Sequence, residues 1–387
     1  MDASSSSVML FVAIVLLPWV CDLTVVFGTG AVFVMLYGVV FALSKSSKNA
    51  KNVLHKFNMW IHGVVHLIFT QETRWKPEKL DDPATLLEAK ESGQEVVKKT
   101  IIFIRHGESQ WNWVFNDGKS PLRFLKPSFF INLATAMFYE TLDAVTGDSV
   151  FLDSPLSQEG VEQARSLSEF LEQKEPHEDK EIEKMRQILL GNETESIVCS
   201  SNLSVLSTGL CRHDFIASLL IRALVTTAIG LWPRLKKKQE KMHILSSLQE
   251  SSRNVDTMSL SLPDSYPPLP VAQDSLEGFD PEKLFITAEN KGNKSICEKG
   301  SVRMFEFAEW VFASNSADVI IAGGHSLYFR NFFRSFLPHS SSHAAKKHKI
   351  KNGGAVSFTF YKSKLGDKEL YMVEEKSIRQ IHLGFNI

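Results

Sequence analysis

Cysteine is scarce in this sequence of 387 residues, which contains four of them. Cys21, Cys199, Cys211 and Cys297 are widely spaced and form no CxxC pair. This spacing argues against a disulfide framework and against a structural zinc site. We therefore predict that the folded part of the chain lies in a reducing compartment.

The chain also lacks an excess of charge of one sign, because 43 Lys and Arg residues almost balance 44 Asp and Glu residues. This balance argues against a nucleic-acid partner. Two basic clusters, Lys236 to Lys238 and Lys346 to Lys351, are interpreted as solvated faces rather than as substrate funnels. Hydrophobic residues make up 44% of the chain and charged residues 22%, which is the balance of a folded protein with a sizeable core.

Charged side chains are missing altogether from Leu23 to Leu43, and Asp22 is the only charge between Val8 and that run. An uncharged apolar run of about 20 residues is long enough for a helix to cross a bilayer. A cleaved signal peptide is the weaker interpretation, because no basic segment precedes the run and the run is too long. We predict that residues 1–44 form a single-pass membrane anchor.

The residues after this predicted span indicate its orientation. No basic residue precedes the span, whereas four lysines follow it, namely Lys45, Lys48, Lys51 and Lys56. An excess of basic residues on one side of a span marks the cytosolic side. We therefore expect the rest of the chain to face the cytosol.

Residues 45–98 are predicted to form a juxtamembrane helix and a connector. Apolar residues recur at helical spacing between Val53 and Phe69, which predicts a helix that packs on the membrane surface or on the folded domain. His62 and His66 lie four residues apart in it, but no third ligand accompanies them, so no metal site is predicted. A polar connector follows, and the folded domain is expected to span residues 99–387.

Beyond this connector, short β-rich runs alternate with helical patterns. The predicted strands are Thr100 to Arg105, Ser196 to Ser200, Asp318 to Gly323, Val356 to Tyr361 and Leu370 to Glu374. The predicted helices are Gln158 to Gln173, Ile221 to Leu231, Val302 to Ala313 and Leu327 to Phe336. Apolar strands separated by helices indicate an α/β fold, with a doubly wound, mostly parallel sheet and helices on both faces. Glu175 to Lys184 and Ser259 to Ser275 are interpreted as surface insertions.

The first predicted strand leads directly into the sequence RHGESQWN, from Arg105 to Asn112. A doubly wound sheet places its ligand at the carboxyl ends of its strands, so a guanidinium and an imidazole there indicate an anion site. This octet resembles the RHGESxWN motif of the histidine phosphatase superfamily, the phosphoglycerate mutase-like enzymes. The resemblance implies a phosphoglycerate mutase-like fold, with His106 taking up a phosphoryl group. It also implies that Gly107, Ser109 and Asn112 bind substrate.

Two further segments resemble motifs of the same superfamily. The sequence from Pro155 to Ala164 is similar to its PLSxxGxxQA element, which we interpret as scaffold, because Ser157 is placed to begin a helix. The sequence GGHSL, from Gly323 to Leu327, is similar to its second histidine motif. This resemblance implies that His325 stabilises the transferring phosphoryl group and that Ser326 binds substrate. A helix begins there, and its free N–H groups favour an anion.

The second arginine motif, SxLxRAxxT, is interrupted in this chain. Ser201 to Leu203 would continue into Ile221 and Arg222 if residues 204–220 were removed. We therefore treat these residues as an insertion and Arg222 as the second phosphate-binding arginine. Two interpretations stay open. The insertion is a tolerated surface loop, since long loops cost little to close, or it displaces Arg222 from the phosphate pocket and impairs the enzyme.

The resemblance also implies an acidic proton donor between Arg222 and His325. Glu250 follows the run Ile244 to Gln249 in the manner of the superfamily's donor, so we predict Glu250 for this role. The alternative is that Glu250 is an exposed helical residue and that Glu289 or Asp256 takes its place.

These residues together predict a mechanism that needs no metal and no other cofactor. Arg105 and Arg222 offer planar donor forks that match phosphate oxygens. A neutral His106 attacks phosphorus without an external base. A protonated His325 stabilises the equatorial oxygens, and Glu250 protonates the leaving alkoxide and then accepts a proton from water.

The predicted function is therefore that of a membrane-anchored phosphatase, a phosphoric monoester hydrolase. A mutase is the first alternative, disfavoured because Ser251 to Thr257 stands where mutases of this superfamily carry an Arg-x-Tyr-Gly segment. The second alternative, motivated by the insertion, is a protein that binds phosphorylated partners without turning them over. The substrate is left open between a phosphorylated small molecule, lipid and protein, since the segments Trp113 to Ser149 and Ser246 to Asn290 are long enough to wall a pocket.

Overall fold

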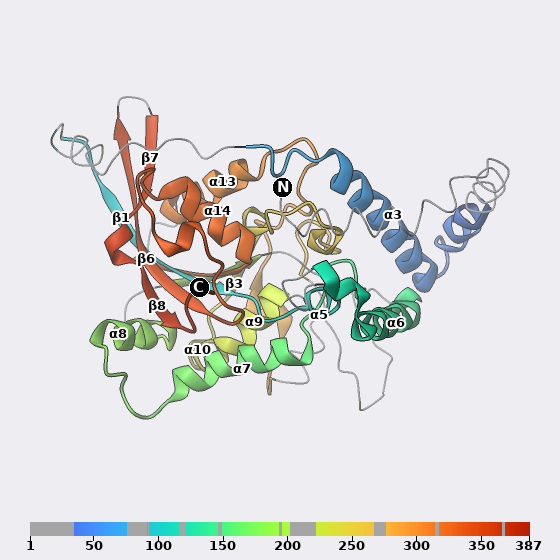
Figure 1. Cartoon of the computed structure of the whole chain (residues 1–387), viewed down its shortest axis with the longest axis horizontal. Coiled ribbons are helices and arrows are strands. Elements are labelled where there is room, and N and C mark those ends of the chain that lie inside the picture. The colour runs from blue at the N-terminus through green and yellow to red at the C-terminus, as the bar shows by residue number, and fades with distance from the viewer. Residues whose placement is uncertain are drawn as a thin grey trace.

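The computed structural model describes residues 35–75, 91, 93–115, 121–145, 149–192, 196–201, 222–266, 276–313, 317–365 and 368–387. Its centre is a sheet of eight strands in the order β4-β3-β2-β5-β1-β6-β7, with β8 paired to β6. Helices lie on both faces of this sheet (Figure 1), which confirms the expected α/β fold. The predicted insertion, residues 204–220, and most of the predicted anchor, residues 1–44, lie outside the described residues.

The strands of one half of the sheet are mutually parallel. They are β1 (Val97–Arg105), β2 (Ser196–Ser201), β3 (Met242–Leu245), β4 (Phe285–Ile286) and β5 (Val319–Gly324). Arg105 at the end of β1 lies opposite Gly324 of β5, and Ser200 of β2 lies opposite Gly323. The carboxyl ends of β1, β5 and β2 are therefore level with one another.

Antiparallel strands complete the sheet, so it is mixed. They are β6 (Ala355–Leu365), β7 (Lys368–Val373) and β8 (Arg379–His382). The sequence patterns identified β1, β2, β5, β6 and β7. They missed β3, β4 and β8, which have only two to four residues each and are too short to show a period.

Alternate residues of β1 enter two separate hydrophobic clusters. Ile102 and Ile104 join the cluster on one face of the sheet, whereas Ile101 and Phe103 join the cluster on the other. The first face carries α7 (Gln158–Glu172), α8 (Lys180–Leu189), α9 (Arg222–Gly230) and α10 (Trp232–Lys238), and the second carries α13 (Gly300–Ala313) and α14 (Ser326–Phe336). Because both faces are buried, the strand sequences are continuously apolar.

The remaining helical segments connect these elements. They are α5 (Gln110–Phe115), α6 (Pro127–Leu142) and α12 (Pro281–Leu284), with the 3-10 turns η1 (Pro121–Leu125), η2 (Asp143–Val145), η3 (Ser246–Leu248), η4 (Val255–Thr257), η5 (Ala344–Lys346) and η6 (Glu375–Ser377).

Two segments that were predicted to be surface insertions are partly structured or buried. In the segment 175–184, α8 begins at Lys180, and the Asp179 side chain caps it by accepting from the backbone N–H of Glu181. In the segment 259–275, Leu260 is buried, and its carbonyl lies 3.1 Å from Nε2 of His55. No residue of 175–184 is buried, so the predicted surface position holds for that segment. The prediction was wrong for Leu260, because polar composition does not reveal a neighbouring helix that covers a loop.

The predicted juxtamembrane helix is α3 (Lys48–Phe69), and residues 35–43 before it are also helical. This helix packs on the folded domain, because a Cβ atom at Gly63 would come within 2.3 Å of a methyl carbon of Val255. Only glycine permits so close an approach. Among the helices within the described ranges, none has the length and hydropathy of a bilayer-crossing segment.

A buried ion pair fastens the end of α3 to the second helical layer. Both carboxylate oxygens of Glu72 accept from the guanidinium of Arg303 on α13, at 2.9 and 2.6 Å. The backbone N–H of Gly300, at the start of α13, also donates to the carbonyl of Glu72. Both side chains are almost completely inaccessible to water, so neither charge can be left alone without a large penalty.

Replacing Arg303 is expected to destabilise the fold strongly. In Arg303→Met, the Glu72 carboxylate stays buried without its partner, and we expect the free energy of unfolding to fall by about 3 to 5 kcal/mol. The matched control is Arg165→Met, which breaks an exposed pair with Glu162 and should cost at most about 1 kcal/mol. Urea unfolding of both variants measures the difference, and equal losses would contradict this account of the pair.

Candidate active site

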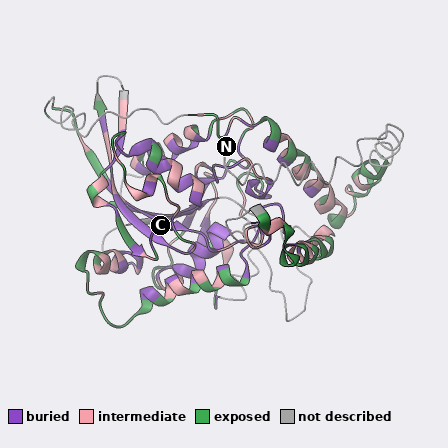
Figure 2. Cartoon of the chain, in the orientation of Figure 1, coloured by how far each residue is buried: buried purple, intermediate pink, exposed green. Residues whose placement is uncertain are grey.

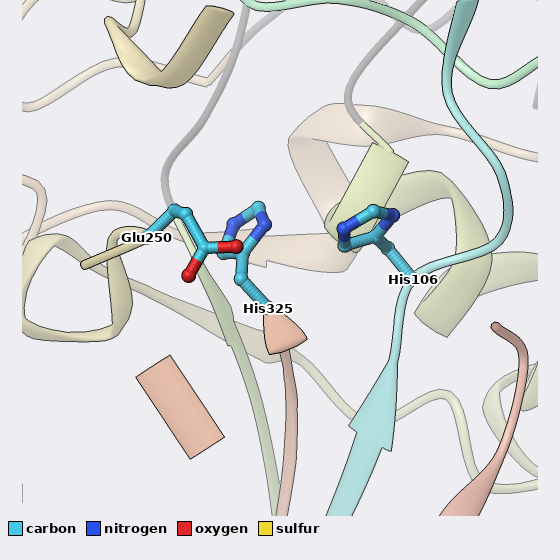
Figure 3. Close-up of side chains that lie close together, drawn as sticks. All are labelled: His106, Glu250 and His325. Carbon is cyan, nitrogen blue, oxygen red and sulfur yellow. The ribbon is translucent and has the colours of Figure 1, made fainter. Parts of the chain in front are cut away.

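The predicted site residues meet at the carboxyl ends of four neighbouring parallel strands. β1 ends at Arg105 and is followed by His106, and β5 ends immediately before His325. α9 begins at Arg222 beyond β2, and Glu250 follows β3 and η3. Figure 3 shows the side chains of His106, His325 and Glu250 directed toward one another. This is the edge at which an open α/β sheet binds its ligand.

A cavity of about 560 Å³ lies at this edge. Of the residues predicted to be catalytic, Arg105, His106, Arg222 and Glu250 line it. His325 is completely buried, and its ring centroid lies 5.1 Å from that of His106. The size is within the range of small-ligand pockets, which is about 300 to 1,000 Å³.

The imidazole of His106 is poised as a nucleophile. Its Nδ1 lies 2.5 Å from the carbonyl oxygen of Gly107. Because a carbonyl only accepts, Nδ1 carries the hydrogen and Nε2 keeps its lone pair. Burial, reinforced by the positive charges of Arg222 and Arg105, holds the pKa of His106 well below its usual range, so the ring is neutral.

Two buried guanidinium groups make the cavity suited to an anion. Arg222 forms an ion pair with Asp256, with NH1 and Oδ2 2.9 Å apart. Arg105 donates from NH1 to the carbonyl of Ile350, and burial lowers its pKa to about 10, so it stays charged at neutral pH. In the structure as described, the Nε atom of each arginine is buried without a hydrogen-bond partner. Buried donors of this kind are normally satisfied, so a phosphate oxygen is a fitting partner.

The position of Arg222 bears on the two interpretations of the insertion. Arg222 is the first described residue of α9 and is 3% exposed in the cavity wall. The structure therefore gives no support to the interpretation in which residues 204–220 displace this arginine from the pocket.

The second histidine differs from expectation in its charge. Burial, together with the charges of Arg222 and neighbouring His106, holds the pKa of His325 well below its usual range. The expected protonated imidazole is therefore neutral as long as no anion is bound. Within the described part of the chain, both ring nitrogens are buried without a hydrogen-bond partner. This leaves His325 ready to donate to a ligand.

The two acids of the cavity differ in their partners. Glu250 accepts from the backbone N–H of Tyr328 at 2.8 Å, and burial raises its pKa, which favours the protonated form. Burial also raises the pKa of Asp256, but this side chain is ion-paired with Arg222. Glu289 contacts His243 and does not line the cavity. Glu250 is therefore the acid best placed to give a proton to a ligand, and Asp256 orients Arg222.

Of the residues predicted to bind substrate, two line the cavity and two do not. Asn112 and Ser326 lie in its wall. The Ser109 hydroxyl accepts from the backbone N–H of Asn112 at 3.2 Å and so caps the start of α5. A Cβ atom at Gly107 would lie 2.2 Å from the carbonyl oxygen of Gly160, so this glycine allows two segments to touch.

These contacts explain why the separate motifs occur together. The backbone N–H of Glu108 donates to the side chain of Gln163 at 2.8 Å, and its carboxylate accepts from the Ser157 hydroxyl at 2.9 Å. The N–H of Gly107 donates to the Thr226 hydroxyl at 3.0 Å, one turn after Arg222. The PLSxxGxxQA element thus holds the RHGESQWN segment in place through hydrogen bonds to Glu108.

The loop that carries Glu250 and Asp256 is held by residues for which the sequence offered no signal. Nζ of Lys294 donates to the carbonyls of Glu250 and Ser252 at 2.7 and 2.8 Å, and to the Thr257 hydroxyl at 3.0 Å. Lysine is seldom buried completely, yet Lys294 is 3% exposed. No motif surrounds this lysine, so only the fold reveals its role.

Lys349 is a site residue that the sequence analysis had in hand and misinterpreted. It lies in the basic run Lys346 to Lys351, which was interpreted as a solvated face. The structure places Lys349 in the cavity wall, where its charge lowers the pKa of His106 further. Lys349 reaches the cavity because it directly precedes Ile350, whose carbonyl accepts a hydrogen bond from Arg105.

Comparisons with known proteins give distant structural matches only. No protein-family model and no curated protein matches this chain. An alpha-ribazole phosphatase from Shigella flexneri is 14% identical, with a TM-score of 0.31, over 74% of this chain and 98% of its own. A mycobacterial glucosyl-3-phosphoglycerate phosphatase is 12% identical, with a TM-score of 0.32, over 72% and 98%. A mutant phosphoserine phosphatase from Entamoeba histolytica, in complex with phosphoserine, is 14% identical, with a TM-score of 0.30, over 67% and 89%. The assignment of a function therefore depends on the residues of the cavity.

Proposed function

We propose that this protein is a membrane-anchored phosphatase that hydrolyses phosphomonoesters through a phosphohistidine on His106. The observation that carries the proposal is that the imidazole of His106 and two buried guanidinium groups line one cavity. A phosphomonoester dianion needs to be neutralised, oriented and attacked in line, and these groups supply each requirement. The anchor is supported by the uncharged run from Leu23 to Leu43.

In the first half of the reaction, Arg105 and Arg222 bind the phosphate oxygens, and Nε2 of His106 attacks phosphorus. The bond from phosphorus to the alkoxide breaks, and the protonated Glu250 gives its proton to the leaving oxygen. A bound dianion raises the pKa of the adjacent His325, which takes up a proton from solvent and stabilises the negative charge on the transferring group.

In the second half, water attacks the phosphorus of the phosphohistidine. The Glu250 carboxylate accepts a proton from this water, the bond between phosphorus and Nε2 breaks, and inorganic phosphate leaves. Glu250 is then protonated again and the imidazole of His106 is neutral. His325 returns its proton to solvent as phosphate leaves, which closes the cycle.

Hydrolysis is favoured over a mutase reaction by the loop after Glu250. Arg253 is the only arginine in that loop, and its Nε donates to the Thr73 hydroxyl rather than into the cavity. No guanidinium of this loop is therefore available to grip a second phosphate group. Catalysis is favoured over binding alone because nucleophile, arginines and acid line one cavity.

Removing the proposed nucleophile tests the central claim. We expect His106→Ala to lower the rate of phosphate release by about 10⁴-fold or more, and to abolish the acid-labile phosphate label on the protein. The control is His339→Ala, an exposed histidine outside the cavity wall, which should keep both. Undiminished hydrolysis by His106→Ala would overturn the proposal, and conversion of 3-phosphoglycerate to 2-phosphoglycerate without phosphate release would support the mutase instead.

The proposed acid is tested by its pH dependence. Because burial raises the pKa of Glu250, its acid form persists above the pH at which an ordinary glutamate has lost its proton, and activity should fall as pH rises through the raised pKa. We expect Glu250→Gln to lower the rate for alkyl phosphates by about 10² to 10⁴-fold and to remove that fall. Aryl phosphates, whose leaving groups need no proton, should be affected less.

The matched control is Glu289→Gln, because the sequence offered Glu289 as an alternative donor and the structure pairs it with His243 outside the cavity wall. We expect Glu289→Gln to keep the fall of activity at alkaline pH. If Glu289→Gln removed this fall and Glu250→Gln kept it, Glu289 rather than Glu250 would be the proton donor.

A metal-dependent hydrolase is the second candidate function, favoured by one observation. Among the described residues, His106, Glu250 and His325 have ligand atoms that all lie within 4.8 Å of one another. Two imidazoles and a carboxylate are a familiar ligand set for divalent metals. Against this, Arg105 and Arg222 line the same cavity, and their charges repel a cation and attract a phosphate dianion.

Chelation separates these two functions. We expect prolonged treatment with a strong chelator to leave phosphate release unchanged, and added Zn²⁺ to inhibit it by occupying the histidines. Loss of activity on chelation, with recovery when a divalent metal is returned, would favour the metal-dependent reaction.

A further inference from the structure

An apolar surface lies on η1 and α6. We define the α6 surface by the exposed side chains that share it, which are Leu122, Leu125, Phe130, Ile131, Met137, Phe138 and Leu142. Each of them is between 56% and 74% exposed. Figure 2 shows the outer side of α6 as largely exposed. Apolar surfaces of this kind on a folded protein mark sites of interaction.

The composition of α6 is unusual for a helix that faces water. Its 16 residues include a single charged side chain, Glu140. That carboxylate is turned toward the domain, where it accepts from the Ser149 hydroxyl at 2.9 Å and from the backbone N–H of Val150 at 2.6 Å. Phe129, three turns earlier on the same side of the helix, is buried. The helix therefore presents no charge on its exposed face, unlike an ordinary amphipathic surface helix.

The α6 surface borders the mouth of the active-site cavity. Arg123 of η1 lines the cavity, while its neighbours Leu122 and Leu125 are exposed. Trp111 also lines the cavity and contacts Phe115, with ring centroids 4.4 Å apart. Phe115 in turn packs against the buried Phe129 of α6, at 6.2 Å. The packed aromatic side chains of Trp111, Phe115 and Phe129 thus connect the cavity wall to α6, whose outer side carries the α6 surface.

The same surface lies beside the segment that follows the predicted span. Asn52 of α3 donates to the carbonyl of Val145 at 3.1 Å, and Lys56 donates to the carbonyl of Asp143, so the first half of α3 is fixed to the end of α6. Figure 1 shows α6 and the start of α3 at the same end of the molecule. The helical residues 35–43, which end the uncharged run, immediately precede α3 and expose Met35, Leu36, Val39, Phe41 and Leu43.

Basic side chains surround these apolar groups. Lys45, Lys48 and Lys51 lie at the start of α3, and Lys126 separates η1 from α6. An apolar face flanked by lysines is the chemistry of a surface that rests on anionic lipid headgroups, with the apolar side chains in the acyl boundary. A protein partner would not require the exposed apolar residues 35–43 and this surface to lie at one end of the molecule (Figure 1).

We propose that the α6 surface docks on the bilayer next to the N-terminal run, and that the substrate is the phosphomonoester headgroup of a membrane lipid. This inference rests on the proposed phosphatase function. The acyl chains stay in the bilayer, and the headgroup passes Arg123 to reach His106. A water-soluble phosphomonoester with the same headgroup does not lie in the bilayer, so docking of the α6 surface does not increase its rate of hydrolysis.

The test compares one headgroup with and without acyl chains. The full chain is reconstituted in phosphatidylcholine vesicles, and phosphate release is measured from phosphatidic acid in the vesicles and from glycerol 3-phosphate in solution. The variant is Ile131→Ser with Phe138→Ser, and the matched control is Val302→Ser with Leu383→Ser, two exposed apolar residues outside the α6 surface and the cavity wall.

We expect kcat/KM of the natural chain to be at least about tenfold higher for phosphatidic acid, since burial of apolar side chains contributes to binding at the bilayer. The α6 variant should lose about tenfold on phosphatidic acid and keep its activity on glycerol 3-phosphate, and the control should keep both. Equal activity of the two variants on vesicles would overturn the proposal. Release from glycerol 3-phosphate alone would also overturn it, while leaving the phosphatase function intact.

A second measurement does not depend on activity. A fluorophore is attached to Met137→Cys, or to Val302→Cys as control, in a chain in which Cys21, Cys211 and Cys297 are serine. Lipids with brominated acyl chains should quench the label at position 137 and spare the label at position 302. Absence of quenching at 137 would overturn the docking, including the case in which the surface is covered by a second copy of the chain. Quenching at 137 without hydrolysis of either substrate would show that the proposed function, rather than the docking, has failed, and the lipid substrate would fall with it.

Discussion

The structure depends on the burial of two guanidinium groups at the carboxyl ends of parallel strands. Arg105 and Arg222 are 7% and 3% exposed, and burial together with their charges holds the pKa values of His106, in the wall of the same cavity, and of the adjacent His325 well below their usual range. Positive charge buried in this way is costly unless a counter-ion compensates it, and Asp256 pairs with only one of the two arginines. The site is therefore organised for a dianion, and the neutral state of His106 is a consequence of the same charges that would bind the substrate.

The close approach of the motifs makes this burial possible. Gly107 touches Gly160, and a Cβ atom at Gly323 would lie within 1.9 Å of the Thr227 hydroxyl, so neither contact tolerates a larger residue. The hydrogen bond from Gly107 to Thr226 joins the strand end of one arginine to the helix of the other. The glycines allow the segments that carry the charged groups to approach closely. The motifs contain these glycines because no larger residue fits at the contacts.

Sequence alone could predict the long elements and the residues in motifs, because periodic burial and strand-end positions leave a pattern. β1, β5 and α7 were predicted within three residues of their ends, and His106, Arg222, Glu250 and His325 lie together as their motifs implied. β4, with two residues, leaves no pattern. The role of Lys294 and the contact between Gly63 and Val255 could not be predicted for another reason, since each depends on contacts between distant parts of the chain that no local signal encodes.

The helix α3 lies in the sequence between the predicted anchor and the folded domain, and it contacts the loop of the proposed acid. α3 follows the helical residues 35–43 after a turn, and it packs through Gly63 against Val255 in the loop between Glu250 and the end of η4. Nδ1 of His66 lies 3.4 Å from the carbonyl of Arg253 in the same loop, and the buried pair of Glu72 and Arg303 locks the end of the helix to α13. A movement of α3 relative to the sheet would therefore shift Glu250, the proposed proton donor, relative to His106. α3 thus supports the loop that carries Glu250 and Asp256, so a chain that lacked this helix would lose the contacts that hold the proposed acid in place.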